Sequence, residues 1–302
     1  MTENPSACPS TYIVIPVHNR KVTTLNCLQH LQTNGDLQRY QVVIVDDGST
    51  DGTADAVRAA YPEVVILQGD GTLWWTGGTA MGMEYAYRQG AKFIIWMNDD
   101  CMPLPGTLPG LVDFMQAHPN ALAAPACYAG ELNESTIQHN GFQNRRGCAA
   151  KPGERLEVDG MSGWCVGMPA TVVSQVGLPD TQRFPHYSGD DMYTLRATRA
   201  GFKAYLIGDL PLVLFGPVHA RLHFKDYFRP GQTPAQILTA LFWDKKSPYR
   251  LSTRFFVFIE RYGFLAGLPL FLAKLMAWSW QYSKLQLEFW CKPDRFSVRN
   301  SV

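Results

Sequence analysis

The chain has 302 residues, of which 46% are hydrophobic and 18% are charged, and these proportions exclude a disordered or fibrous protein. Its 27 Lys and Arg residues nearly balance 26 Asp and Glu residues, so the net charge of +1 gives no general attraction to nucleic acid. Seven scattered cysteines without CxxC spacing favour reduced thiols in a cytoplasmic protein. The polar start MTENPSACPS lacks an apolar run of signal-peptide length, which supports the same expectation.

Short apolar runs alternate with helix-like segments through the first 126 residues. Helices are expected at residues 22–31 and 53–60, and strands at residues 12–17, 42–46, 64–67, 93–97 and 121–126. Unbroken apolar strands are typical of a parallel sheet covered on both faces, so the pattern predicts an α/β fold with a Rossmann-like, mostly parallel sheet. Polar, Gly-rich loops are expected from residue 128 to about 160, then a helix at 190–200 and a strand within 204–215.

Two adjacent carboxylates, Asp99 and Asp100, follow the apolar run that begins at Phe93. In an open α/β sheet this position, just beyond the carboxyl end of a strand, is where ligands bind. Two neighbouring acids repel each other, and a divalent cation relieves that repulsion. The pair therefore predicts a site for a metal ion and a diphosphate.

Polar motifs also follow the first two predicted strands. VIPVHNR, residues 14–20, ends in a loop from which Asn19 either caps the next helix or contacts a ligand. VDDGSTDGT, residues 45–53, contains turn glycines and helix-capping residues, and these explain much of it. They do not explain the acids at the strand end, and we expect Asp47 to contact the base of a nucleotide.

These motifs, together with NDD at 98–100 and SGDD at 188–191, resemble the ordered motifs of glycosyltransferase family 2, which has the GT-A fold. The likeness covers roughly residues 11–223. It implies transfer of a sugar from a nucleotide sugar, with a Mn or Mg ion held on the diphosphate by Asp100, next to Asp99. It also implies a nucleoside site that includes the residues Pro16, His18, Asn19, Arg20 and Asp47.

The resemblance divides the chain into a GT-A domain at 1–228 and a helical, aromatic-rich extension at 229–302. The GT-A domain would have a donor half at about 11–127 and an acceptor half at about 128–228. Between the donor motifs lies GDGTLWWTGGTAMG, residues 69–82, which resembles the donor-binding segment of family members. Gly77 and Gly78 would allow close approach of the diphosphate, while Trp74 or Trp75 stacks on the donor or lies in the core.

The resemblance also supplies a catalytic base. Counting back six residues from Arg196 selects Asp190, with Asp191 beside it, although an acid in a first helical turn also serves as a cap or dipole partner. As the base, Asp190 would remove the proton of the attacking hydroxyl in a single, inverting displacement. Ser162, Gly163 and Trp164 stand where relatives have an acceptor loop, although Trp164 also fits a core position. His219 is a further candidate metal ligand or a structural histidine.

The C-terminal run at residues 263–280 is strongly apolar but interrupted by Pro269 and Lys274. It is short for a membrane-spanning helix. An interfacial helix within 254–284, with Trp278 and Trp280 near lipid headgroups, would place the enzyme at the cytoplasmic face of a membrane; a homodimer contact and a core helix are the alternatives.

The predicted function is a metal-dependent, inverting glycosyltransferase that uses a UDP-, dTDP- or GDP-sugar. Its acceptor would be a hydroxyl of a glycan or a lipid-linked molecule, as in the synthesis of cell-surface polysaccharide or another envelope glycan. The alternatives are a non-catalytic nucleotide-sugar or glycan-binding protein of the same fold and a sugar-phosphate nucleotidyltransferase. A sugar-phosphate nucleotidyltransferase would have a GxGTRL-type loop after the first strand, and this chain lacks one.

Overall fold

The computed structural model describes residues 10–216 and 222–291. By its internal contacts the chain divides into two compact units, one of Met1–Pro185 with Gly189–Val218 and one of His186–Ser188 with His219–Val302. These units divide after residue 218. The domain boundary expected between residues 228 and 229 remains a prediction.

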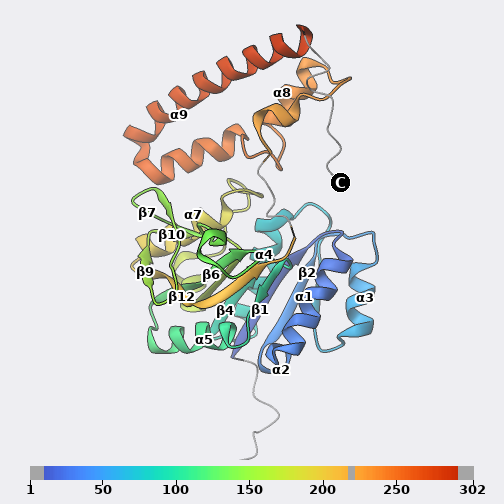
Figure 1. Ribbon diagram of the computed structural model, residues 1–302, viewed down its shortest axis with the longest axis vertical. Coiled ribbons are helices and arrows are strands. Elements are labelled where there is room, and N and C mark those ends of the chain that lie inside the picture. Colours follow the sequence, from blue (N-terminus) through green and yellow to red (C-terminus); the bar gives the residue numbers. More distant parts are fainter. Residues whose placement is uncertain (1–9, 217–221, 292–302) are drawn as a thin grey trace, which may run out of the picture. The chain divides into compact units, whose positions relative to one another are not determined.

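The first unit begins with the predicted alternation of strands and helices (Figure 1). All five predicted strands and both predicted helices of this part are present. The elements are β1 (Thr11–Val17), α1 (Lys21–Thr33), α2 (Asp36–Arg39), β2 (Gln41–Asp46), α3 (Thr53–Ala60), β3 (Val65–Gln68), α4 (Trp74–Arg88), β4 (Phe93–Met97), β5 (Cys101–Pro103), α5 (Thr107–Ala117) and β6 (Ala121–Ala129).

The second half of this unit is made of shorter pieces, as the polar and Gly-rich sequence predicts. The predicted helix at 190–200 and the predicted strand at 204–215 both form. The elements are η1 (Glu134–Thr136), β7 (Gly141–Gln143), β8 (Arg146–Cys148), β9 (Arg155–Val158), β10 (Gly160–Met161), β11 (Cys165–Pro169), α6 (Thr171–Val176), α7 (Gly189–Arg199) and β12 (Lys203–Leu214).

The main sheet has the strand order β3-β2-β1-β4-β11-β6-β12-β5, with β9 also paired to β12. β1 runs parallel to β2 and β4, β2 to β3, and β6 to β12. β11 is antiparallel to β4 and β6, and both β5 and β9 are antiparallel to β12. The α/β class is confirmed, and the sheet is mixed in its second half because β11 returns after short strands rather than after a crossover helix.

Helices cover both faces of this sheet, so the strands are apolar on both sides. Along β1, Ile13 and Ile15 join one buried cluster, to which α1 and α5 contribute. Tyr12 and Val14 join a second cluster with residues of α4 and α7. Side chains of a strand alternate between faces, and this alternation accounts for the two clusters.

Helix α4 was not predicted, because its first half is the Gly-rich segment at 69–82. Two of its glycines lie against β1, where a larger residue would not fit. A Cβ atom at Gly78 would lie 3.0 Å from the Cβ atom of Pro16, and one at Gly82 would collide with Val14. The glycines therefore let the helix pack closely on the sheet, and this packing overrides their low helix propensity.

The second unit contains η2 (Phe224–Tyr227), α8 (Pro234–Phe242) and α9 (Leu251–Cys291). Helix α9 is interrupted at Gly263, whose φ of 74° and ψ of 165° are not helical. An aromatic and aliphatic core joins the three elements, consisting of Phe224, Phe228, Ile237, Leu241, Phe242, Trp278 and Phe289. The expectation that Trp278 lies near lipid headgroups is wrong, because this side chain is 5% exposed and packs against Phe242 and Tyr249.

Asp36, the first residue of α2, is 1% exposed, and burial raises the pKa of its carboxyl group from 3.8 to about 6. A folded-state pKa above the unfolded value means that the native protein binds a proton more tightly, so stability falls as the pH rises from about 4 to 7. We expect Asp36→Asn to increase the free energy of unfolding at pH 8 by about 1–3 kcal/mol. Urea unfolding at pH 5 and pH 8 would measure this gain, which should be smaller at pH 5; an equal gain at both would contradict the prediction.

Candidate active site

The polar loops that follow β1, β2 and β4 lie at one edge of the main sheet. β1 pairs in parallel with both β2 and β4, so the three strands end on the same side. The loops carry residues 18–20, 47–51 and 98–100. Open α/β sheets bind their ligands at this edge, beyond the carboxyl ends of the strands.

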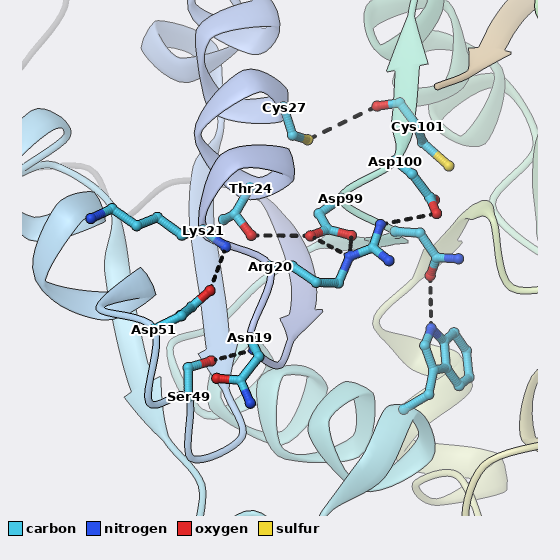
Figure 2. A network of polar contacts seen from close by, with 12 residues as sticks. Asn19, Arg20, Lys21, Thr24, Cys27, Ser49, Asp51, Asp99, Asp100 and Cys101 are labelled. Atoms are coloured by element: carbon cyan, nitrogen blue, oxygen red, sulfur yellow. Dashed lines mark hydrogen bonds and ion pairs between the residues drawn. The ribbon is translucent and has the colours of Figure 1, made fainter. Parts of the chain in front are cut away.

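The first two of these loops are joined by hydrogen bonds (Figure 2). The backbone N–H of Asn19 donates to Ser49 Oγ at 2.8 Å, and the N–H of Lys21, the first residue of α1, donates to Asp51 at 3.0 Å. Asp51 also accepts from the backbone N–H of Thr53, the first residue of α3, at 3.0 Å. Residues 49–51 therefore fix the position of the VIPVHNR loop as well as the start of α3.

Asp47 is buried, with 6% of its surface exposed, and its carboxylate accepts three backbone hydrogen bonds. The N–H groups of Gly71 and Leu73 donate to Oδ1 at 2.8 and 3.2 Å, and that of Trp74 donates to Oδ2 at 2.8 Å. His18 Nδ1 lies 2.6 Å from the Asp47 carbonyl oxygen. Asp47 thus holds the turn that begins α4, a role that the sequence did not indicate, and its expected contact with a nucleotide base remains a prediction.

Asp99 and Asp100 share one guanidinium group, that of Arg20 (Figure 2). Arg20 Nε lies 2.8 Å from Asp99 Oδ1, and Nη2 lies 3.2 Å from Asp100 Oδ2. Thr24 Oγ1 also donates to Asp99 at 3.0 Å. Asp99 is 3% exposed, and its burial raises the pKa of the carboxyl group despite the nearby Arg20. Arg20, which sequence reasoning assigned to the donor, therefore compensates the charge of the acidic pair.

The second acid of the pair suits a divalent cation better than the first. The side chain of Asp100 is 19% exposed, whereas that of Asp99 is 5% exposed. The described residues include no group of three or more His, Cys, Asp or Glu side chains that would hold a metal ion alone. Mg²⁺ and similar ions are often held by one or two carboxylates with phosphate oxygens and water, and Asp100 fits that role. The other predicted metal ligand, His219, lies outside the described residues.

Trp75 connects the acidic element to the predicted base. Its indole Nε1–H donates to Asn98 Oδ1 at 2.7 Å, and its ring packs edge-on against Trp96 at a centroid distance of 5.9 Å. The same indole lies against Gly163, where an added Cβ atom would be 2.5 Å from Trp75 Cζ2. The backbone N–H of Gly163 donates to Asp190 Oδ2. Trp75 is therefore a packed, hydrogen-bonded residue between the Asn98–Asp100 element and the turn at 162–164.

The turn at residues 162–164 completes this connection. The carbonyl oxygen of Trp164 accepts the backbone N–H of Asn98 at 2.9 Å and lies 3.2 Å from Cys101 Sγ. The backbone N–H of Ser162 donates to the Asn140 carbonyl oxygen at 2.9 Å. One short turn thus contacts both the element that carries Asp99 and Asp100 and, through Gly163, the carboxylate of Asp190.

A family model described as Glycosyl transferase family 2 matches residues 12–175, more than half of the chain. The chain belongs to glycosyl transferase family 2. It is also 26% identical over 258 residues to the glycosyltransferase AglE of Haloferax volcanii, a match that covers 77% of this chain and 75% of that protein. It is therefore a glycosyltransferase, as the resemblance implies.

Solved structures support the GT-A fold for this glycosyltransferase. A crystal structure of GalNAc-T7 with UDP, GalNAc and Mn²⁺ matches 89% of this chain with a TM-score of 0.58 at 11% identity. The match spans 55% of the GalNAc-T7 chain. A crystal structure of residues 1–349 of S. aureus TarS in complex with UDP-GlcNAc matches 84% of this chain and 73% of the TarS chain, with a TM-score of 0.54 at 16% identity. At these low sequence identities, the two comparisons show a similarity of fold alone.

The remaining predicted donor residues of the glycosyltransferase have structural contacts as well. Pro16 lies in β1 against Gly78, and Gly77 lies against Leu73, so both of the predicted donor glycines are packed. Trp74 is half-buried and has a left-handed backbone, with a φ of 58°. The predicted roles of these residues in donor binding remain predictions.

The two predicted catalytic acids are the second and third residues of α7, and both are half-buried. The contact of Asp190 with Gly163 links it to the turn at 162–164. Sequence reasoning missed Thr24 and the bridging role of Trp75, because each acts on a residue far along the chain. The spacing of their own segments contained no signal for these contacts.

Proposed function

We propose that this family 2 glycosyltransferase is metal-dependent and inverting, and that Asp190 is its general base. The observation that carries the proposal is the turn at 162–164, which contacts both Asp190 and the Asn98–Asp100 element. In the proposed reaction the base and the diphosphate site must act on the same sugar. A single turn that contacts both Asp190 and the Asn98–Asp100 element suits that requirement. Deprotonation by a positioned carboxylate compensates for the low nucleophilicity of a sugar hydroxyl at neutral pH.

The chain's own groups would act as follows. Asp190 accepts the proton of the acceptor hydroxyl as its oxygen attacks the anomeric carbon, while the nucleoside diphosphate leaves from the opposite face. This single displacement inverts the anomeric centre. A divalent cation, when bound at Asp100, would neutralise the charge that develops on the departing diphosphate. Arg20 pairs with the carboxylates of both Asp99 and Asp100 and so compensates their charge.

For the donor we propose a UDP-, dTDP- or GDP-sugar, bound by the loops after β1 and β2 and by the start of α4. Crystal structures of similar fold contain UDP or UDP-GlcNAc, which supports a nucleotide-sugar donor. For the acceptor we propose a hydroxyl of a glycan or a lipid-linked molecule, bound at residues 162–164. The reaction would take place in the cytoplasm and contribute to the synthesis of an envelope glycan. A panel of nucleotide sugars tested by isothermal titration would identify the donor.

We expect Asp100→Asn to remove the metal-dependent part of nucleotide binding. A ligand at 100 times its dissociation constant stabilises the native state by about 2.7 kcal/mol, so UDP with MnCl₂ should raise the melting temperature of the wild type by several degrees. The variant should melt at the same temperature with UDP whether or not MnCl₂ is present. Asp55→Asn, at an acid whose side chain is 88% exposed on α3, is the matched control and should behave as wild type. An unchanged metal response in Asp100→Asn would contradict the metal assignment.

A further inference from the structure

One side of α9 beyond Gly263 presents an apolar stripe to solvent. Its members recur mostly at intervals of three or four residues, which places them on one helix face. The exposed fraction is 92% for Leu265, 69% for Met276, 76% for Trp280 and 66% for Trp290. We call this face the α9 stripe, and it consists of Leu265, Pro269, Leu272, Met276, Trp280, Leu287 and Trp290.

The opposite side of the same helix is buried within the second unit. Phe271 packs against Phe255 and Phe258, which belong to the part of α9 before the kink. Farther along, Trp278 and Phe289 enter the aromatic core with residues of η2 and α8. By length and composition α9 could cross a membrane. A helix that packs on protein through Phe271, Trp278 and Phe289 and exposes an apolar stripe elsewhere is suited to lie at a membrane surface.

The charge of the chain is strongly divided between its two parts. Residues 222–291 contain nine Lys and Arg but only four Asp and Glu, a net charge of +5. Residues 1–220 contain 14 Lys and Arg against 21 Asp and Glu, a net charge of −7. The overall value of +1 conceals this division. Within the second unit the exposed basic residues include Lys245, Lys246, Lys274 and Lys284.

We propose that the α9 stripe docks on an anionic lipid bilayer. The stripe enters the boundary between headgroups and acyl chains, with Trp280 and Trp290 at the depth that tryptophan prefers. Lys284 extends toward lipid phosphates, since long basic side chains keep their charge in the headgroup region. The ammonium group of Lys274 instead lies over the ring of Trp278, 5.5 Å from its centroid. Each basic residue near an anionic surface adds attraction.

Charge complementarity favours a bilayer over a second copy of the chain as the occupant of the α9 stripe. Two stripes facing each other would bring together two copies of residues 222–291, each with a net charge of +5, and these segments would repel. An anionic membrane satisfies both features, because it accepts apolar side chains and attracts basic ones. The proposal does not depend on which reaction the first unit performs.

Flotation of the full chain with lipid vesicles tests the proposal. Vesicles of equal parts phosphatidylglycerol and phosphatidylcholine should carry the protein, and binding should weaken severalfold when NaCl rises from 50 to 500 mM. Met276→Glu and Trp280→Glu should each weaken binding roughly tenfold or more, because each places a charge in the apolar boundary. The matched control is Leu132→Glu, at an exposed leucine of the first unit, and it should bind as wild type.

A further variant separates charge from apolar contact. Lys284→Glu should reduce binding to the anionic vesicles and leave the weaker binding to pure phosphatidylcholine unchanged. Melting temperature with and without nucleotide reports whether each variant is folded and whether its first unit still binds ligand. Equal binding of wild type and Met276→Glu would overturn the proposal. A wild-type dimer that does not float and that Met276→Glu converts to a monomer would also overturn it, because the α9 stripe would then be a self-interface.

Discussion

Replacing Asp190 with Asn is expected to lower the rate of sugar transfer by roughly 10²–10⁴-fold while leaving donor affinity unchanged. An amide cannot accept the proton of the attacking hydroxyl at neutral pH. Its oxygen can still accept the hydrogen bond from the Gly163 N–H, so the turn at 162–164 should keep its position. Initial rates with acceptor extracts, together with isothermal titration of the donor, would measure the two quantities separately.

The neighbouring residue provides the control for this experiment. Asp191 shares the first turn of α7 with Asp190, and Asp191→Asn makes the same chemical change one position later. We expect this variant to keep most of the wild-type rate. A normal rate in Asp190→Asn, or an equal loss in both variants, would refute the assignment of the base. Tight donor binding by the wild type with no transfer to any acceptor would favour a non-catalytic binding protein instead.

Replacing Arg20 with Met is expected to lower the free energy of unfolding by about 2–3 kcal/mol at pH 7. Removing one partner of a buried ion pair leaves the other charge uncompensated. The loss of stability should be smaller than for a fully buried pair, because the Arg20 side chain is 31% exposed. The loss should shrink as the pH falls. Burial already raises the pKa of Asp99, and without Arg20 this pKa rises further, so acid protonates Asp99 and removes the unfavourable charge. Urea unfolding at pH 5 and pH 7 would measure the change.

Two further variants make this prediction specific to the ion pair. The double variant Arg20→Met with Asp99→Asn should recover much of the lost stability, because the buried charge is gone. Arg58→Met removes an arginine from a surface pair with Asp55, in which the side chains are 51% and 88% exposed. Its effect should stay below about 1 kcal/mol. If the double variant were less stable than Arg20→Met, Arg20 would have a structural role unrelated to the charge of Asp99.

Much of the fold could be predicted from local pattern. The strands β1, β2, β4 and β6 are buried runs of mostly apolar residues, β3 is a half-buried one, and such runs are recognisable without tertiary information. Helix α4 could not be predicted in this way, since the low helix propensity of its glycines points to a loop. The close approach of α4 to β1 at Gly78 and Gly82 explains why glycine is required there.

The acidic motifs were visible in the sequence, but their partners were not. Asp99 and Asp100 stand out because two acids directly follow an apolar strand. Their counter-ion, Arg20, lies 79 residues before Asp99 in the chain and reaches it only because β1 and β4 are adjacent. Trp75 and Asn98, and Gly163 and Asp190, are likewise separated in the chain and meet only in the folded protein.

The sequence by itself determined the family, the α/β class and the positions of the loops that bear acids, because these depend on residue types at short spacing. The tertiary structure alone decided which charges are paired, which side chains of α9 face solvent, and that Asp47 is held by the backbone at the start of α4. Pairing and burial depend on which segments become neighbours in the folded chain. That choice results from the packing of the whole sheet and its helices, and a local pattern does not contain it.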